Sequence, residues 1–179
     1  MRLFLAIDLP PASKQKLHDQ LKSIYQEYPY IRWVGQENFH ITLHFFGEVN
    51  KADTIIKGMH DIVYDVPSFQ LYSGETDLFI KNKITIYLGF ARNKILEKLV
   101  EDIKARLAFP SEVKFIPHLA LGRYRIPSKQ QYLLLKKKIE HLKIDIDFTI
   151  SHIILFESIL ETQKPVYKKV AKFSLFRET

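Results

Sequence analysis

The sequence predicts an α+β fold in which antiparallel strands are interrupted by amphipathic helices. Short stretches of alternating apolar and polar residues, such as FHITLH and PHLAL, are typical of half-buried strands. Longer stretches carry apolar residues at helical spacing, and the two kinds do not follow a strict strand–helix alternation. The 179 residues, of which 46% are hydrophobic, suffice for one well-packed domain or for two small lobes that share a core.

The first part of the chain is expected to contain three strands and two helices. Residues 2–7 are strand-like, and the helix expected over residues 12–28 carries its apolar side chains on one face. Short strands are expected over residues 31–34 and 40–46, on either side of the polar turn GQEN. A second amphipathic helix fits residues 52–65.

The middle of the chain continues with the same kinds of element. Two strands are expected near residues 69–80 and 84–90, because both stretches are rich in β-branched and aromatic residues. A helix over about residues 93–107 follows, with its leucine, isoleucine and valine side chains facing inward. Residues 118–124 form the next expected strand.

The last part begins with a helix and ends in strands. Ser128 and Gln131 have the spacing of a capping box, which predicts a helix that continues to about residue 141. From Lys143 onward, KIDIDFTI, HIILFES and VYKKVAKFSL are each typical of a strand.

The composition favours a polyanionic partner and a reducing compartment. Lys and Arg number 27 against 20 Asp and Glu, which gives a net charge of +7 and favours nucleic acid first and anionic membrane second. No cysteine is present, so disulfides and thiolate metal sites are excluded and a cytoplasmic location is expected. The opening MRLFLAIDLPP is too short for a membrane span and lacks a signal-cleavage pattern, so no membrane association is expected. Because no zipper pattern is present, we expect a monomer.

A weak internal repeat relates two parts of the chain. The order helix, strand with a leading histidine, and helix occurs around residues 12–65 and again around 93–141. Two similar lobes that face each other would bring His40 and His118 to equivalent places on opposite sides of a cleft.

The two histidine strands each present one polar face. Side chains alternate along a strand, so His40, Thr42 and His44 are expected on one face of the first, and His118 and Ala120 on one face of the second. Either strand alone is interpreted as a half-buried strand with an incidental surface histidine. The matched pair favours an acid and a base, because imidazole titrates near neutrality. The residues alone do not decide which histidine is the acid.

These strands and their surroundings resemble the 2H phosphoesterase superfamily, which carries two His-x-Thr/Ser-x motifs. The chain is similar in particular to the bacterial and archaeal RNA 2′,3′-cyclic phosphodiesterases, also called 2′-5′ RNA ligases. RLFLAIDLP resembles the opening strand of that family, WVGQENFHITLHFFGEV the first motif block, FIPHLALGR the second, and ILFES a strand near the end. Four blocks in this order cover nearly the whole chain and form a specific signal.

The resemblance implies a bilobal, pseudo-twofold fold, with residues 1–179 forming a single domain of two similar lobes. In such a fold antiparallel sheets line a central cleft and helices pack outside. The resemblance also implies hydrolysis of 2′,3′-cyclic phosphates on RNA ends or nucleotides to 2′-phosphomonoesters, without metal or cofactor. By position, His40 would be the proton donor to the leaving 3′ oxygen and His118 the proton acceptor that activates water. Thr42 would donate a hydrogen bond to the phosphate.

The chain departs from the family pattern at Ala120, where the second motif should have Thr or Ser. A methyl group cannot donate to phosphate, and loss of one charge-assisted hydrogen bond costs about 1.5–3 kcal/mol. Arg123 is expected to compensate, because guanidinium suits phosphate and an arginine commonly follows the second motif at this spacing. Simple alternation points Arg123 away from the His118 face, so a bulge at Gly122 would be needed to redirect it. Arg125 is the weaker candidate, and the alternative for both is an exposed edge-strand charge.

Several other residues near the two motifs are candidates for a role. A metal site on His40 and His44 is disfavoured, because no carboxylate or thiolate partner accompanies them; His44 is expected to line the cleft or its edge. His152 is interpreted as structural or surface. Three aromatic residues beside the motifs are candidates for stacking on a nucleobase, with core packing as the alternative: Trp33, Phe39 and Tyr124.

Two alternative functions remain open. One is a non-catalytic RNA- or nucleotide-binding member of the family, for which Ala120 would be the first sign of lost chemistry. The other is a phosphodiesterase that acts on a different cyclic substrate, such as ADP-ribose 1″,2″-cyclic phosphate. The physiological RNA is not indicated by the sequence.

Overall fold

The computed structural model describes residues 1–107, 114–125, 128–161 and 164–176. Its strands are β1 (Arg2–Asp8), β2 (Arg32–Trp33), β3 (His40–Glu48), β4 (Phe69–Ile80), β5 (Ile84–Phe90), β6 (His118–Tyr124), β7 (Asp147–Ile150), β8 (His152–Leu160) and β9 (Pro165–Ser174). Its helices are α1 (Pro11–Glu27), the short 3₁₀ helix η1 (Gln36–Asn38), α2 (Asp53–Val63), α3 (Lys94–Leu107) and α4 (Lys129–Glu140). Every expected element is present, and the α+β class with antiparallel pairing is confirmed.

Two local expectations show how side chains set the bounds of elements. The capping box of α4 is confirmed, because the Ser128 side chain accepts from the Gln131 backbone and the Gln131 side chain accepts from the Ser128 backbone. The strand expected from Lys143 begins only at Asp147. Residues before it are held instead by side chains, since Gln20 bonds both backbone groups of Asp145.

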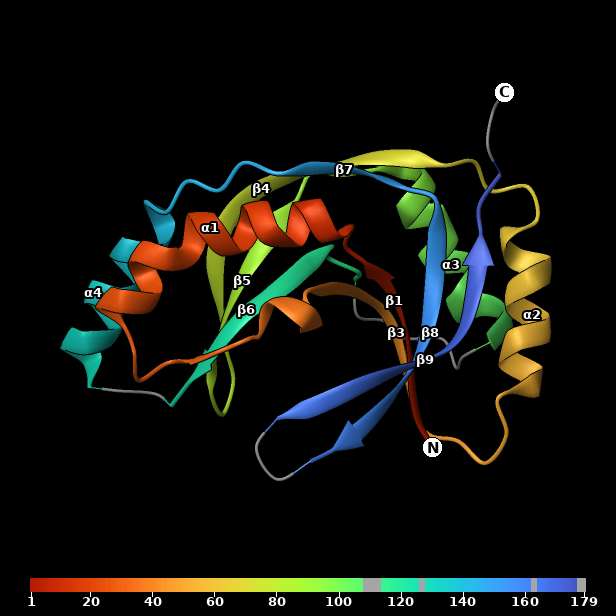
Figure 1. Cartoon of the computed structure of the whole chain (residues 1–179), viewed down its shortest axis with the longest axis horizontal. Coiled ribbons are helices and arrows are strands. Elements are labelled where there is room, and N and C mark those ends of the chain that lie inside the picture. The colour runs from red at the N-terminus through yellow and green to blue at the C-terminus, as the bar shows by residue number, and fades with distance from the viewer. Residues whose placement is uncertain (108–113, 126–127, 162–163, 177–179) are drawn as a thin grey trace.

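The described strands form one sheet of nine, in which eight follow the order β7-β4-β5-β6-β3-β1-β8-β9 and β2 pairs with β6 (Figure 1). All the strand pairs are antiparallel. The order is symmetric about its centre: the histidine strands β3 and β6 are neighbours, β1 and β5 flank them, and β8 and β4 lie beyond. This symmetry gives the weak sequence repeat a structural basis.

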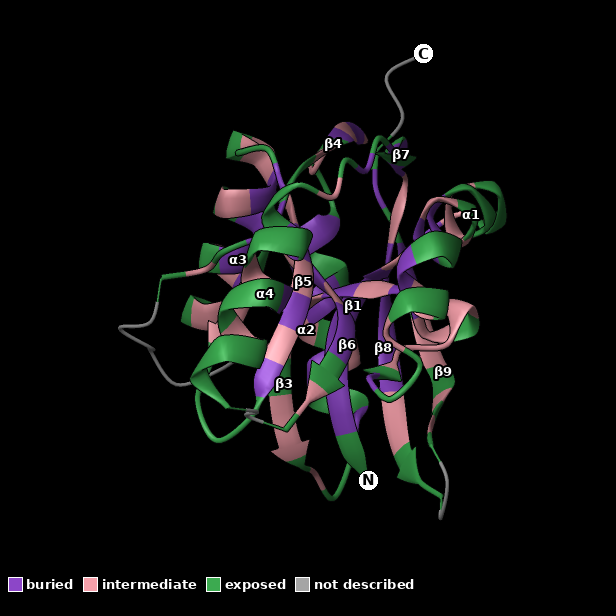
Figure 2. Cartoon of the chain, turned by 90° about the vertical axis from the view of Figure 1, so that its left-hand side faces the viewer, coloured by how far each residue is buried: buried purple, intermediate pink, exposed green. Residues whose placement is uncertain are grey.

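The four described α-helices pack in two pairs, one pair over each half of the sheet. Helices α2 and α3 contact each other, and they contact β9 and β3 respectively, whereas α4 contacts β4 in the other half. Figure 1 shows α1 beside α4 over the β4–β5–β6 half, and α2 beside α3 over the opposite half. Helix α1, which follows β1 in the sequence, therefore packs over the half of the sheet that does not contain β1. Helix α3, which follows β5, likewise packs over the half that does not contain β5. Outward residues of α1 and α4 are exposed, while the central strands carry the buried segments (Figure 2).

The two faces of the sheet are packed differently. On the helix-covered face, alternate residues of the central strands join one large buried core, including Leu5, Ile41 and Leu119. On the other face, a smaller buried cluster consists of Phe4, Ala6, Ile154 and Phe156, with Tyr167 against it. We call this second face the open face. The burial of the helix-covered face fixes which residues of β3 and β6 point to the open one.

The halves of the sheet meet at a single ladder pair. Ile41 of β3 lies opposite Leu119 of β6, and both side chains are fully buried. By this register, His40 is next to Ala120 and Thr42 is next to His118, all on the open face. The expected approach of the two motifs thus arises from adjacent strands of one continuous sheet.

Candidate active site

His40 and His118 are held in the same way. Each is the first residue of its strand, and each places its ring Nδ1 2.7 Å from the backbone oxygen two residues earlier, in Asn38 and Ile116 respectively. A carbonyl oxygen can only accept, so Nδ1 carries the hydrogen in both rings and Nε2 is left for other partners. The repeat therefore extends to the orientation and tautomer of the two imidazoles.

Aromatic side chains enclose His40. The rings of Phe4 and Tyr167 have centroids 5.2 and 5.1 Å from that of His40, and Phe156 lies at 6.4 Å. Nε2 of His40 is 3.1 Å from the hydroxyl oxygen of Thr42. With the ring hydrogen on Nδ1, the Thr42 hydroxyl donates to Nε2, so the two polar groups of the first motif lie within hydrogen-bonding distance of each other.

His118 has a different aromatic environment. Phe79 and Tyr87 stack with centroids 4.0 Å apart, and both meet His118 edge-on at 5.0 and 5.6 Å. The cross-strand neighbour of Ala120 is Tyr87, whereas the cross-strand neighbour of Thr42 is Ala6. In the first half the motif residue is Thr and its neighbour is Ala, whereas in the second half the motif residue is Ala and its neighbour is the larger Tyr. The space beside Ala120 is therefore bordered by a tyrosine ring.

Each histidine strand contains a bulge at the same place. The register shifts by one residue between Leu5 and Ala6 against β3, and likewise between Ile86 and Tyr87 against β6. After the second shift, Leu121 and Gly122 are both buried and Arg123 is exposed, paired with Thr85. Arg123 therefore returns to the open face, and the predicted bulge at Gly122 is confirmed.

Gly122 is required at this bulge by close packing. A Cβ atom on it would lie 2.8 Å from Cε3 of Trp33 and 3.1 Å from Cγ2 of Ile31. Trp33 is fixed in turn, because its indole nitrogen donates to the backbone oxygen of Tyr28. The candidate stacking residue Trp33 is therefore a packing residue.

The expectation that His44 lies on the face of His40 is wrong. The bulge in β3 pairs His44 with Leu5, which belongs to the helix-covered core, and turns Phe45 to the open face opposite Phe4. Burial lowers the pKa of His44, and the charge of Lys104 on α3 lowers it further. A metal site shared by His40 and His44 is excluded by these opposite faces.

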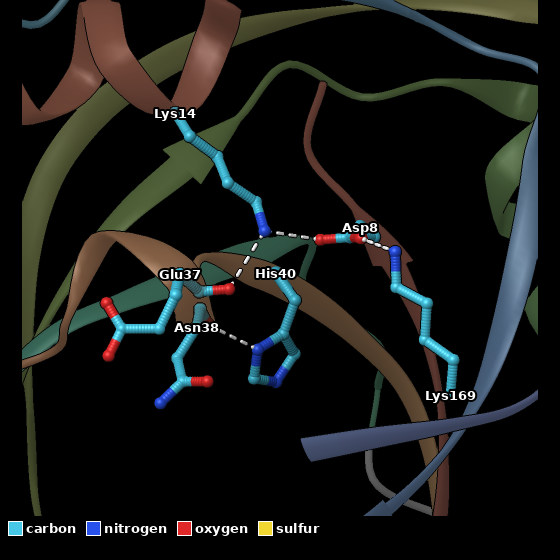
Figure 3. A network of polar contacts seen from close by, with 6 residues as sticks. All are labelled: Asp8, Lys14, Glu37, Asn38, His40 and Lys169. Atoms are coloured by element: carbon cyan, nitrogen blue, oxygen red, sulfur yellow. Dashed lines mark hydrogen bonds and ion pairs between the residues drawn. The ribbon is translucent and has the colours of Figure 1, made fainter. Parts of the chain in front are cut away.

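A network of charged groups adjoins His40 (Figure 3). Asp8 is the ladder partner of His40, and its carboxylate oxygens bind Lys14 at 2.6 Å and Lys169 at 2.7 Å. Lys14 also donates to the backbone oxygen of Glu37 at 2.9 Å. Burial raises the pKa of Asp8, but the hydrogen bonds from the two lysines outweigh it, so the pKa lies below its usual value. Asp8 is therefore a fixed negative charge beside His40.

Opposing effects act on the imidazole of His40. Burial is the largest, and it lowers the pKa of His40 below its usual value. The hydrogen bond to Asn38 and the charge of Asp8 raise this pKa, whereas the charges of Lys14 and Arg123 lower it. The residue that corresponds to Asp8 beside His118 is Gly89, which has no side chain. The two histidines therefore differ in whether a carboxylate lies at the cross-strand position.

A hollow of about 710 Å³ lies beside this network, where α1 begins and β7 passes to β8. Asp8, Lys14, Lys169 and His152 are among its lining residues, and neither His40 nor His118 is. His152 is half-buried and contacts the Ser151 hydroxyl at 3.0 Å, in agreement with its interpretation as a structural or surface residue.

The aromatic contacts of the site differ from those expected. Phe39 is fully buried, which confirms the core alternative, and Tyr124 contacts the ring of Tyr30. The rings that do contact the histidines come from strands far away in the sequence: Phe4, Phe79, Tyr87, Phe156 and Tyr167. Asp8 was also missed, although it lies in the opening block that resembles the family. Only the strand order could have revealed these residues.

In the described part of the chain, no group of three or more His, Cys, Asp or Glu side chains is placed to hold a metal ion. None of the described helices has the length and apolar character needed to cross a membrane.

Sequence comparison relates the chain to one family. The sequence profile of the 2′-5′ RNA ligase superfamily matches residues 10–159. A protein named RNA 2′,3′-cyclic phosphodiesterase from Methanocaldococcus jannaschii is 30% identical over 97% of this chain and 100% of its own length. A protein of the same name from Thermotoga maritima is 28% identical, over 94% of this chain and 92% of its own.

Solved structures show the same fold. TT0787 of Thermus thermophilus matches with a TM-score of 0.81 at 20% identity, covering all of both chains. Apo LigT of E. coli matches with a TM-score of 0.80 at 20% identity, covering 97% of this chain and 96% of LigT. The profile match over most of the chain, the curated relatives and the shared fold lead to one conclusion: the chain belongs to the 2′-5′ RNA ligase superfamily.

Proposed function

We propose that the protein hydrolyses 2′,3′-cyclic phosphates at RNA ends to 2′-phosphomonoesters by acid–base catalysis with His40 and His118. The observation that carries this proposal is the pair of equivalently oriented imidazoles on adjacent strands, each with Nε2 left for other partners. The relatives named RNA 2′,3′-cyclic phosphodiesterase and a LigT structure with 3′-AMP support the substrate class.

The reaction needs one proton accepted and one donated. His118 accepts a proton from water through Nε2 as the water oxygen attacks phosphorus. The bond from phosphorus to the 3′ oxygen breaks, and His40 gives its proton to that oxygen. The product keeps the phosphate on the 2′ oxygen. Each proton transfer is typically worth about 10²- to 10⁴-fold in rate.

The charge on the cyclic phosphate is held by groups of both strands. Thr42 donates its hydroxyl hydrogen to one phosphate oxygen, close to Nε2 of His40. Arg123 lies on the same face, and its charge acts on His40 and Tyr167. A guanidinium in this place substitutes for the hydroxyl that Ala120 lacks.

The surroundings of the histidines support His40 as the acid. The acid must carry a proton when substrate binds, yet burial disfavours the charged form of His40. Asp8, kept ionised by Lys14 and Lys169, offsets part of that effect. His118, the base, has Gly89 at the corresponding position and needs no such counter-charge. The assignment taken from the family resemblance thus has a physical reason in this chain.

The first test is hydrolysis of a short RNA that ends in a 2′,3′-cyclic phosphate, with EDTA present. The wild type is expected to form the 2′-phosphate, and His40→Ala and His118→Ala are each expected to lower kcat/KM by about 10²- to 10⁴-fold, the usual worth of a proton-transfer group. His141→Ala, a surface histidine on the far end of α4, is the control. Binding of the RNA without any product would mean a non-catalytic member, and activity that survives both substitutions would refute the two roles.

A second test concerns the position where the second motif lacks its hydroxyl. Ala120→Thr is expected to raise kcat, by at most about 10- to 100-fold, because the new hydroxyl would donate a charge-assisted hydrogen bond to the phosphate. The measurement is kcat of the single variant beside the double variant Tyr87→Ala/Ala120→Thr, which copies the Ala6 and Thr42 pair of the other half. An unchanged or lower rate in both would mean that another group already occupies this place.

A third test uses the charges that surround His40. Asp8→Asn removes a negative charge, so the pKa of His40 falls and the acid loses its proton at lower pH. Lys14→Met removes a positive charge, and the pKa of His40 rises. We expect kcat/KM of Asp8→Asn to be about tenfold below wild type at a pH well above the pKa of His40, since a neighbouring charge typically shifts a pKa by about one unit. The difference should shrink as the pH falls and vanish only where His40 is fully protonated in both proteins.

NMR titration of His40 in the same variants provides the readout that does not need activity. Asp102→Asn is the control, because Asp102 is paired with Lys98 on the surface of α3. A purely structural role for Asp8 would lower the rate equally at all pH values and leave the titration of His40 unmoved.

A further inference from the structure

Two arginines lie side by side across the short ladder between β2 and β6. Arg32 is the partner of Arg123, and Trp33 is the partner of Gly122. The backbone nitrogen of Val34 continues the pairing by donating to the oxygen of Leu121 at 2.8 Å. Ladder partners point to the same face of a sheet, so Arg32 projects beside Arg123.

The bulge of β6 decides which face this is. Because the register shifts at Leu121 and Gly122, Arg123 lies on the open face, and its charge reaches His40 and Tyr167. Arg32, which is exposed, shares that face. The two guanidinium groups therefore continue the histidine face along β6 and β2, away from His118 and Ala120.

This arrangement is unfavourable without an anion. Like charges directly opposite each other destabilise a ladder. In the described part of the chain, neither guanidinium forms an ion pair with a carboxylate. The carboxylates near His40 already form ion pairs with lysines. Asp8 pairs with Lys14 and Lys169, and Glu37 pairs with Lys164. Among the described residues, no carboxylate is therefore left to neutralise the two guanidinium groups, and a bound anion would.

We infer that Arg32 forms a second phosphate subsite, which binds the phosphodiester on the 5′ side of the terminal nucleotide while Arg123 faces the cyclic phosphate. The inference rests on the proposed function and extends it to the choice of substrate. A cyclic mononucleotide has one phosphate, whereas an RNA end has a second one nucleotide away. Guanidinium binds phosphate oxygens with two parallel hydrogen bonds, so adjacent arginines suit adjacent phosphates. The subsite thus selects an RNA chain over a free cyclic nucleotide.

The test compares two substrates that differ in the second phosphate. Wild type, Arg32→Ala and Arg32→Lys are assayed on a dinucleotide that ends in a 2′,3′-cyclic phosphate and on the matching cyclic mononucleotide. Arg32→Ala is expected to lower kcat/KM for the dinucleotide by about tenfold or more, the worth of one charge-assisted contact. Hydrolysis of the mononucleotide should change by less than about twofold. For Arg32→Lys, which keeps the charge, kcat/KM for the dinucleotide should lie between the values of wild type and Arg32→Ala. This variant should also retain the salt dependence that Arg32→Ala loses.

Arg92→Ala is the matched control, because Arg92 is an exposed arginine that is paired with Glu97. Equal losses on both substrates would place Arg32 at the cyclic phosphate or in the fold, and no loss on either would remove the subsite; both overturn the inference. If the wild type hydrolyses neither substrate, the proposed function fails. The subsite is then tested by binding of a dinucleotide 2′-phosphate against a nucleoside 2′-phosphate, where Arg32→Ala must abolish the preference for the dinucleotide.

Discussion

The site depends on one contact, the ladder pair of Ile41 and Leu119 that joins the halves of the sheet. Both side chains are fully buried against the helix-covered core, so the flanking residues must point to the opposite face. That constraint brings His40, Thr42, His118 and Ala120 together, although they come from segments far apart in the sequence. A slip of one residue at this pair would turn either motif into the core.

The two halves of the sheet are similar, so the few positions at which they differ are informative. Bulges, histidine tautomers and strand neighbours repeat between the halves, whereas the charges do not. A carboxylate lies beside His40 and a glycine beside His118, and two arginines are ladder partners across β2 and β6. This asymmetry of charge suits the proposed reaction, in which one imidazole must begin charged and the other neutral. The family resemblance gives these roles, and the electrostatics supply a reason for them.

Much of the fold could be predicted from the sequence, because alternation and helical spacing are local signals. The bounds of β4, β5 and β6 agree with the expected ranges, and the bulge at Gly122 was anticipated from the need to redirect Arg123. The face of His44 was mispredicted, since a bulge in β3 depends on its pairing with β1. Asp8, Tyr87 and Arg32 were missed for the same reason: each is recognised only by the residue across the ladder, which composition and spacing do not reveal.

The central claim is that the two Nε2 atoms act on one phosphate. The most direct measurement is a crystal structure of the protein with a nucleoside 2′-monophosphate, the product of the proposed reaction. We predict a phosphate within hydrogen-bonding distance, about 2.7–3.2 Å, of Nε2 of both His40 and His118. A phosphate held by one histidine alone, or bound instead in the hollow beside Lys14 and Lys169, would contradict the account.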